Sequence, residues 1–151
     1  MISNQHELLE LAPIKNMVGT KQKEHGVSWG LSEAGYDIRI KQDVIFKPVA
    51  NTVATKWMDN GKQFGVWDYG RFTLASAIEE FDMPDCLVGV VHDKSTWARQ
   101  GLSVFNTVIE PGWKGFLTLE LVYHGNEELI IPAGSGIAQV IFHRTSNKVK
   151  Y

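Results

Sequence analysis

The chain has 151 residues and a mass of 17.0 kDa, which is most simply one domain (residues 1–151) long enough to bury a core. Its formal charge of −2 argues against a nucleic-acid backbone as partner. A single cysteine, Cys86, excludes an intramolecular disulfide framework and fits a reducing compartment. No apolar run approaches the roughly 18 residues of a membrane span. We therefore expect a soluble, cytoplasmic protein with no membrane partner.

In chain order, the first predicted element is a short helix within residues 3–11, with N-cap candidates at its start and Pro13 beyond its end. Beyond about residue 34 the pattern predicts strands. The strand candidates are residues 36–40, 44–46, 65–69, 87–91, 116–123, 128–131 and 137–142. Asn60-Gly61 and Asn126-Glu127 are turn candidates. Short strands separated by Gly, Pro and Asn predict a mainly β fold, either a barrel or a jelly-roll-like sandwich.

A helical segment interrupts the strands at residues 94–100. It opens with Lys94, Ser95 and Thr96, of which the Ser-Thr pair provides N-cap residues. A strand that leads into such a helix exposes unpaired backbone N–H groups, and with Lys94 and Arg99 nearby these could hold a phosphate. The alternative is an ordinary capped helix.

Glu120 lies in an otherwise apolar strand. Along that strand Glu120 shares a face with Phe116, Thr118 and Val122, whereas the leucines beside it point to the other face. The carboxylate is either on a solvated face or inside a cleft. In a cleft, desolvation would raise the pKa of Glu120 and suit it to proton transfer.

The turn before this strand carries Glu110 and Trp113. An aromatic ring can pack against a sugar and an acid can accept a hydrogen bond from its hydroxyl, although Trp113 could equally be part of the core. Zinc deaminases need more cysteines than this chain has, and no Walker loop or Gly-x-Ser-x-Gly elbow occurs. A metal centre built only from protein ligands is not expected.

Four segments, taken in order, resemble the dCTP deaminase/dUTPase family. They are A-G-Y-D-I-R at 34–39, D-K-S-T-W-A-R-Q-G-L at 93–102, V-I-E-P-G-W-K-G at 108–115 and I-P-A-G-S-G-I-A-Q at 131–139. The resemblance, which includes short phage-type members, implies a distorted β-barrel of the dUTPase-like type with a few short helices. It also implies a homotrimer with active sites between subunits.

By position, the resemblance places Lys94, Ser95 and Thr96 where the family binds phosphates, with Lys94 in place of a more usual arginine. Glu110 falls where an acid contacts the deoxyribose 3′-hydroxyl, an acid that in dUTPases also activates water. Trp113 falls where an aromatic packs on the sugar and excludes a 2′-hydroxyl.

Glu120 and Arg99 match the deaminase branch of the family. There the glutamate activates water for attack on C4 of cytosine, while the arginine and Ser95 hold the site. One carboxylate can deprotonate water and then protonate N3 and the leaving ammonia, so no zinc is required. A simple salt bridge between Arg99 and Glu120 is the structural alternative.

Three departures from the family affect the substrate. The segment 102–109 is about two residues shorter than the family's hairpin that reads the pyrimidine, and it contains the binding candidates Asn106 and Ile109. Gln139, also a substrate-binding candidate, looks more like the dUTPase branch. The chain ends at Tyr151 without a Gly- or Gln-rich tail, so the phosphate end is expected either to be open or to be closed by residues outside this sequence.

The sequence therefore predicts zinc-independent deamination of a deoxycytidine nucleotide, most simply dCTP to dUTP and ammonia, with Mg²⁺ carried on the substrate phosphates. The alternatives are dUTP pyrophosphatase with Glu110 as the base, a bifunctional enzyme, or an inactive member that binds nucleotides or regulatory proteins.

Overall fold

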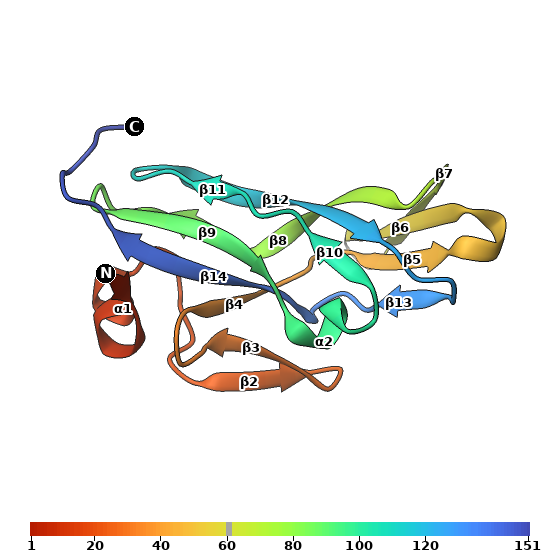
Figure 1. The fold of residues 1–151 in the computed structure, drawn as a ribbon, viewed down its shortest axis with the longest axis horizontal. Coiled ribbons are helices and arrows are strands. Elements are labelled where there is room, and N and C mark those ends of the chain that lie inside the picture. Colours follow the sequence, from red (N-terminus) through yellow and green to blue (C-terminus); the bar gives the residue numbers. More distant parts are fainter. Residues whose placement is uncertain (60–61) are drawn as a thin grey trace.

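The protein is built mainly from β-strands (Figure 1). The computed structural model describes residues 1–59 and 62–151, with side chains described for residues 1–56 and 68–151. Buried side chains from all three sheets belong to one hydrophobic core. Among the helices of the described residues, none has the length and apolar character needed to span a membrane.

The largest sheet has seven strands in the order β11-β9-β14-β4-β3-β2, with β1 paired to β14. Its strands are β1 (Ile2–Ser3), β2 (Lys21–Glu24), β3 (Val27–Leu31), β4 (Tyr36–Arg39), β9 (Leu87–Asp93), β11 (Val108–Ile109) and β14 (Gly136–Arg144). All of these pairings are antiparallel. The longest pairing in this sheet, β14 with β9, places Asp93 at the end of β9 opposite Ala138 near the start of β14.

Two smaller sheets complete the fold. One has the order β10-β12-β8 and the other the order β13-β5-β6-β7. Their strands are β10 (Leu102–Val104), β12 (Lys114–Tyr123), β8 (Phe72–Asp82), β13 (Leu129–Ile131), β5 (Asp43–Lys47), β6 (Thr52–Asp59) and β7 (Lys62–Tyr69). The turn expected at Asn60-Gly61 lies outside the described residues. The described strands form three open sheets, so the expected barrel is not closed.

The helices are short: α1 (Gln5–Leu11), the 3₁₀ turn η1 (Pro48–Ala50) and α2 (Ser95–Ala98). The helix predicted before Pro13 is confirmed, and it ends at Ala12 in a left-handed conformation. The Ser-Thr cap predicted for α2 is wrong, because the N-cap position falls on Lys94. Ser95 and Thr96 are instead the first two helical residues.

Each predicted strand is present within one or two residues of its expected bounds, apart from β7, which begins three residues earlier than expected. The expectation that strands begin only after residue 34 is wrong, because the β2–β3 hairpin precedes it. The four residues of β2 are all exposed and polar, so they carry no alternation that sequence could detect. The strand β8 was also missed, since its buried face uses alanines and Glu79 among larger residues.

Gly35 lies where β4 meets β14, in the first of the four family-like segments. A Cβ atom added there would lie 2.1 Å from the backbone oxygen of Val140. We expect Gly35→Ala to lower the free energy of unfolding by about 2–4 kcal/mol, since backbone must move to relieve the overlap. Urea denaturation measures this change. Gly19→Ala is the matched control, because its Cβ would meet only the flexible end of Leu9, and an equal loss there would contradict the packing argument.

Candidate active site

A cavity of about 300 Å³ lies between β11, β12 and the turn that joins them. We call it the carboxylate cavity. Its lining residues are Thr107, Val108, Ile109, Glu110, Trp113, Phe116, Leu117, Thr118, Glu120 and Tyr151. Four residues singled out from the sequence therefore meet in one place: Ile109, Glu110, Trp113 and Glu120.

The turn that carries Glu110 and Trp113 is held by backbone hydrogen bonds. The N–H of Trp113 donates to the carbonyl oxygen of Glu110 at 3.2 Å, and the N–H of Met83 donates to the carbonyl oxygen of Trp113 at 2.9 Å. The Trp113 ring lies 6.1 Å from the Phe81 ring, between centroids, and is half-buried. Trp113 thus packs against the core and also lines the cavity, where a sugar could reach its ring.

Glu120 is half-buried on β12, with alternation as predicted: Leu119 and Leu121 are buried on the opposite face. Its backbone oxygen accepts a hydrogen bond from the N–H of Phe105 at 3.1 Å. Among the described residues its carboxylate has no hydrogen-bond or ion-pair partner, and the salt bridge to Arg99 is not formed within this chain. A cavity-lining carboxylate with unused oxygens can accept a proton from a bound water.

The segment 102–109 does not form the expected hairpin. Its first strand, β10, pairs with β12, whereas its second strand, β11, pairs with β9 of the seven-stranded sheet. Residues 105–107 therefore cross from one sheet to another. Asn106 is exposed in this crossing and does not line the carboxylate cavity, while Thr107 does.

Lys94 points inward rather than to solvent. Its Nζ donates to Oδ2 of Asp37 at 2.6 Å and to Oγ of Ser28 at 2.8 Å. The two charged side chains are only 11% and 6% exposed, so the ion pair is largely withdrawn from water. We call these two residues the Lys94–Asp37 pair. Asp37 was not among the residues predicted for the site, although it lies in the first family-like segment.

The helix α2 is anchored by Trp97. The Nε1–H of Trp97 donates to the backbone oxygen of Gly136 at 2.6 Å, and the ring is buried. Ser95 and Arg99 are left exposed, and Thr96 is half-exposed. The guanidinium of Arg99 has no partner in the part of the chain that the structure describes.

Gln139 occupies an internal position on β14, opposite Asp37 on one side and His92 on the other. Its Nε2 donates to Oγ of Ser32 at 2.8 Å, and the same oxygen accepts from the N–H of Gly35 at 3.1 Å. The Gln139 side chain therefore braces the turn that leads into β4.

Apart from Asn106, the predicted site residues thus fall into two groups. Ile109, Glu110, Trp113 and Glu120 line the carboxylate cavity, while Lys94, Ser95, Thr96, Arg99 and Gln139 lie at α2 and β14, outside its lining. Phe116 and Thr118 also line the cavity, and the period of β12 could have indicated them. Tyr151 could not have been found this way, because it is far from β12 in sequence.

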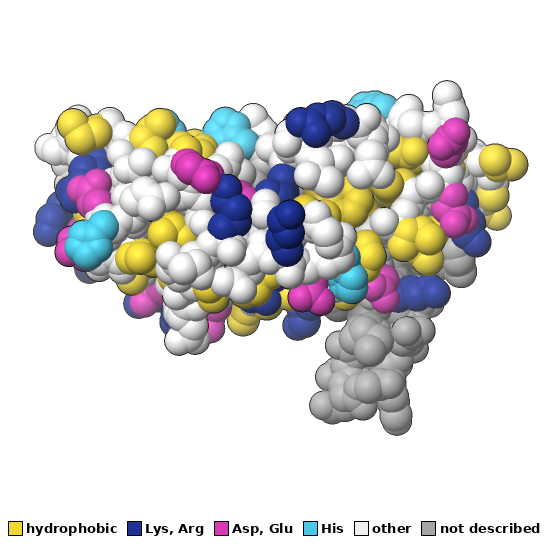
Figure 2. All heavy atoms as spheres, turned by 90° about the horizontal axis from the view of Figure 1, so that it is seen from below, with side chains coloured by type: hydrophobic (Ala, Val, Ile, Leu, Met, Phe, Trp, Pro, Cys, Tyr) yellow, Lys and Arg dark blue, Asp and Glu magenta, His cyan; other side chains and the backbone are white. Residues whose placement is uncertain are grey.

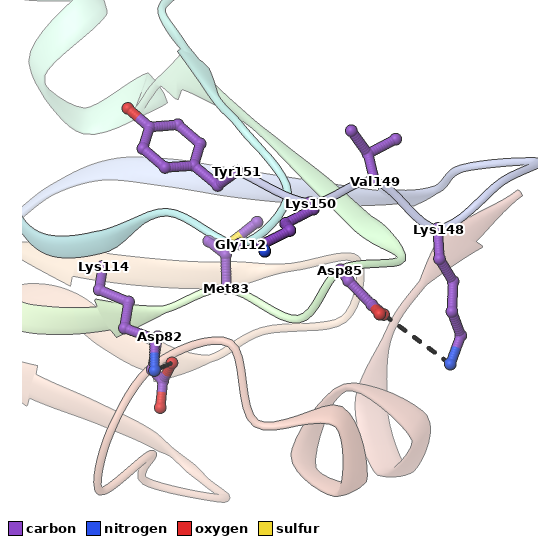
Figure 3. Close-up of a pocket in the computed structure, with 9 residues that line it drawn as sticks. All are labelled: Asp82, Met83, Asp85, Gly112, Lys114, Lys148, Val149, Lys150 and Tyr151. Atoms are coloured by element: carbon purple, nitrogen blue, oxygen red, sulfur yellow. Dashed lines mark ion pairs between the residues drawn. The ribbon is translucent and has the colours of Figure 1, made fainter.

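A larger cavity of about 630 Å³ lies under the last residues of the chain (Figure 3). Two ion pairs line it: Lys114 Nζ lies 3.1 Å from Asp82, and Lys148 Nζ lies 4.0 Å from Asp85. Lys150, also in the lining, is exposed. Both pairs are well exposed, so this cavity has no desolvated acid or base suited to catalysis. It shares Tyr151 with the carboxylate cavity.

No three His, Cys, Asp or Glu side chains gather in a group that could hold a metal ion within the described residues.

Burial is the main cause that raises the pKa of the Tyr36 hydroxyl above its ordinary value of 10.0. That hydroxyl accepts a hydrogen bond from the N–H of Val18 at 3.1 Å, which ties the chain before β2 to β4.

Sequence comparison gives consistent relatives. A model of the dCTP deaminase-like family matches residues 14–145. The dCTP deaminase of Campylobacter jejuni (strain RM1221) is 39% identical over 132 residues, which cover 81% of this chain and 70% of the relative. The dCTP deaminase of Protochlamydia amoebophila is 34% identical over 146 residues, which cover 91% of this chain and 78% of the relative.

Solved structures with a similar fold have lower sequence identity. The dCTP deaminase from Agrobacterium tumefaciens superposes with a TM-score of 0.58 at 17% identity, over 89% of this chain and 44% of that one. EIAV dUTPase superposes with a TM-score of 0.56 at 18% identity, over 87% and 92% of the two chains. At these identities the likeness supports the fold and nothing finer, and it agrees with the dUTPase-like architecture expected from the sequence.

Proposed function

The chain belongs to the dCTP deaminase-like family, and from this premise we propose that it is a hydrolase that deaminates a deoxycytidine nucleotide. The reaction is dCTP and water to dUTP and ammonia. The observation that carries the proposal is the carboxylate cavity, because it unites Glu120, which the deaminase branch requires, with Glu110 and Trp113.

Glu120 is the general base in this proposal. Its carboxylate takes a proton from a water molecule as the water oxygen bonds to C4 of cytosine. The same proton then passes to N3. Glu120 next moves the remaining proton of the new C4 hydroxyl to the amino group, so that the C4 carbonyl forms, the C4–N bond breaks and ammonia leaves. The support is that the Glu120 carboxylate lines the cavity and is not occupied by any other described group.

In this proposal Glu110 and Trp113 bind the sugar of the nucleotide. Glu110 is exposed at the cavity and can accept a hydrogen bond from the 3′-hydroxyl, while the Trp113 ring packs on the deoxyribose. A 2′-hydroxyl would have to fit against the same ring, which favours deoxyribonucleotides. Ile109 is buried in the lining of the same cavity.

We further propose that a neighbouring copy completes each site in a homotrimer. The face of β8 and β12 that carries Glu120, together with the neighbouring segment 105–108, exposes several large apolar side chains to about half of their area. They are Phe72, Leu74, Phe105, Val108 and Phe116. Such a patch is typical of a protein interface. In this proposal the copy that covers the patch also contributes its Ser95, Thr96 and Arg99 to the cavity, where Arg99 and Ser95 position the reacting groups.

The phosphates are assigned to residues 94–99, which include α2 and which we call the α2 loop. Mg²⁺ enters as part of the nucleotide. Gln139, the remaining substrate-binding candidate, also braces the turn before β4 through Ser32. The single cysteine, half-buried and free, fits a cytoplasmic enzyme.

The second candidate is dUTP pyrophosphatase activity, alone or after deamination. The feature that favours it is Glu110, an exposed carboxylate in the same cavity at the position where the dUTPase branch has its base. The two reactions differ in product, because one releases ammonia and the other releases pyrophosphate.

A substrate panel tests the proposal. Purified protein with Mg²⁺ is given the mono-, di- and triphosphates of deoxycytidine and deoxyuridine, and the products are resolved by chromatography. Ammonia and dUTP from dCTP are expected. Pyrophosphate from dUTP without ammonia from any cytidine substrate would instead establish the second candidate. Thermal stabilisation by nucleotides with neither product would indicate an inactive binding protein.

A further inference from the structure

The cation expected to bind phosphate is already neutralised. In the Lys94–Asp37 pair the carboxylate oxygen lies 2.6 Å from the ammonium nitrogen, and both side chains are nearly buried. The opposite charges cancel most of the field that a phosphate would feel. Two of the three ammonium protons are also committed, one to Asp37 and one to Ser28. A polyphosphate at the α2 loop therefore needs a cation from elsewhere.

Lys23 on β2 lies beside this pair. The β2–β3 register places Lys23 directly opposite Ser28. Residues directly opposite in an antiparallel pair point to the same face, with Cβ atoms about 5 Å apart. Ser28 is the residue whose hydroxyl accepts from Lys94, so the stem of Lys23 starts next to the Lys94–Asp37 pair. Figure 1 shows the carboxyl end of β2 close to α2.

The Lys23 ammonium is uncommitted. The side chain is exposed and has no ion-pair or hydrogen-bond partner among the described residues. Lys21, two residues earlier on the same face, is in contrast held by Glu33 at 2.7 Å. The adjacent acid Glu24 lies opposite Val27 and so points to the other face. Figure 2 shows lysine and arginine side chains gathered in the middle of the face that contains this hairpin.

We propose that Lys23 is a phosphate-binding residue of the nucleotide site, which supplies from β2 the positive charge that Lys94 does not. This assignment rests on the proposed function, because it presumes that nucleotide phosphates sit at the α2 loop. A charge-assisted bond from an exposed ammonium favours ligands with more phosphate charge. Lys23 therefore selects triphosphate over monophosphate and has no effect on the nucleoside.

The test compares Lys23→Met with Lys21→Met, a matched control on the same strand and face. Both are made in full-length protein that also carries Glu120→Gln, so that dCTP, dCMP and deoxycytidine can be titrated without turnover. Lys23→Met should raise the dissociation constant of dCTP about fivefold, with a smaller rise for dCMP and none for deoxycytidine. Lys23→Arg should restore dCTP binding, and added salt should shrink the difference.

Several outcomes would overturn the assignment of Lys23: an equal loss in Lys21→Met, an equal loss for deoxycytidine, or no binding of any nucleotide. Turnover by protein with Glu120 intact separates this inference from the proposed function. A selective loss of dCTP affinity in Lys23→Met, with no ammonia formed by the unsubstituted protein, contradicts deamination alone. Ammonia formation with unchanged affinity in Lys23→Met contradicts Lys23 alone.

Discussion

Glu120→Gln should lower the rate of ammonia release from dCTP by about 10³-fold. Glutamine has the same size and can hold the same hydrogen bonds through its oxygen, but it cannot take a proton from water. Because Glu120 has no partner among the described residues, no ion pair is lost and the fold should be kept. Steady-state kinetics measure the rate, and titration should show a dissociation constant for dCTP within about twofold of the original.

The control for this substitution is Glu128→Gln. Glu128 is an exposed acid in the connection after β12 and lies outside the carboxylate cavity, so its replacement should leave the rate unchanged. Size-exclusion chromatography confirms that both variants keep the same assembly. A Glu120→Gln enzyme that still releases ammonia at the original rate would remove Glu120 from the mechanism.

Co-expression of two inactive variants should recover activity. Glu120→Gln damages the carboxylate cavity, and Arg99→Ala damages the α2 loop. We assume that each site takes its carboxylate cavity from one copy and its α2 loop from the next. A site is then intact when the Arg99→Ala copy supplies the cavity, which still has Glu120, and the Glu120→Gln copy supplies the loop, which still has Arg99. Random assembly gives this combination in about one quarter of sites. Ammonia release by the co-expressed mixture, relative to each variant alone, measures it.

The matching control pairs Glu120→Gln with Glu110→Ala. Both substitutions lie in the same cavity, so no arrangement of copies rebuilds an intact site, and the mixture should stay inactive. No recovery with the Arg99 variant would mean that the cavity and the loop act within a single chain. Recovery in the control would mean that Glu110 and Glu120 of one chain do not serve the same site. The separation of the two groups of residues in one chain is the reason to expect otherwise.

The sequence could predict the carboxylate cavity because its parts are local. Glu110, Trp113 and Glu120 lie within eleven residues, and strand alternation alone places Glu120 opposite the buried leucines. The strands with strong β-branched or aromatic patterns were predicted for the same reason.

What the sequence could not predict depends on contacts between distant segments. The role of Asp37 emerges only when β4 and the end of β9 are brought together by β14, which pairs with both. The polar β2 has no periodic pattern, and its position beside Ser28 depends on the hairpin register. The crossing at residues 105–107 could not be predicted from the local sequence, because two short strands that follow one another are expected to pair with each other.

The crossing at residues 105–107 also limits how far β10 and β11 can separate. Three residues can span at most about 11 Å, so β10 and β11 cannot move apart by more than the chain between them allows. Each strand is tied by its pairing to a different sheet, and the wall at Thr107 is therefore tethered to the sheet that carries Glu120. The crossing therefore limits the distance between the two sheets at this point. Room for a substituent on the base must come from the choice of side chains along this wall rather than from a loop that swings open.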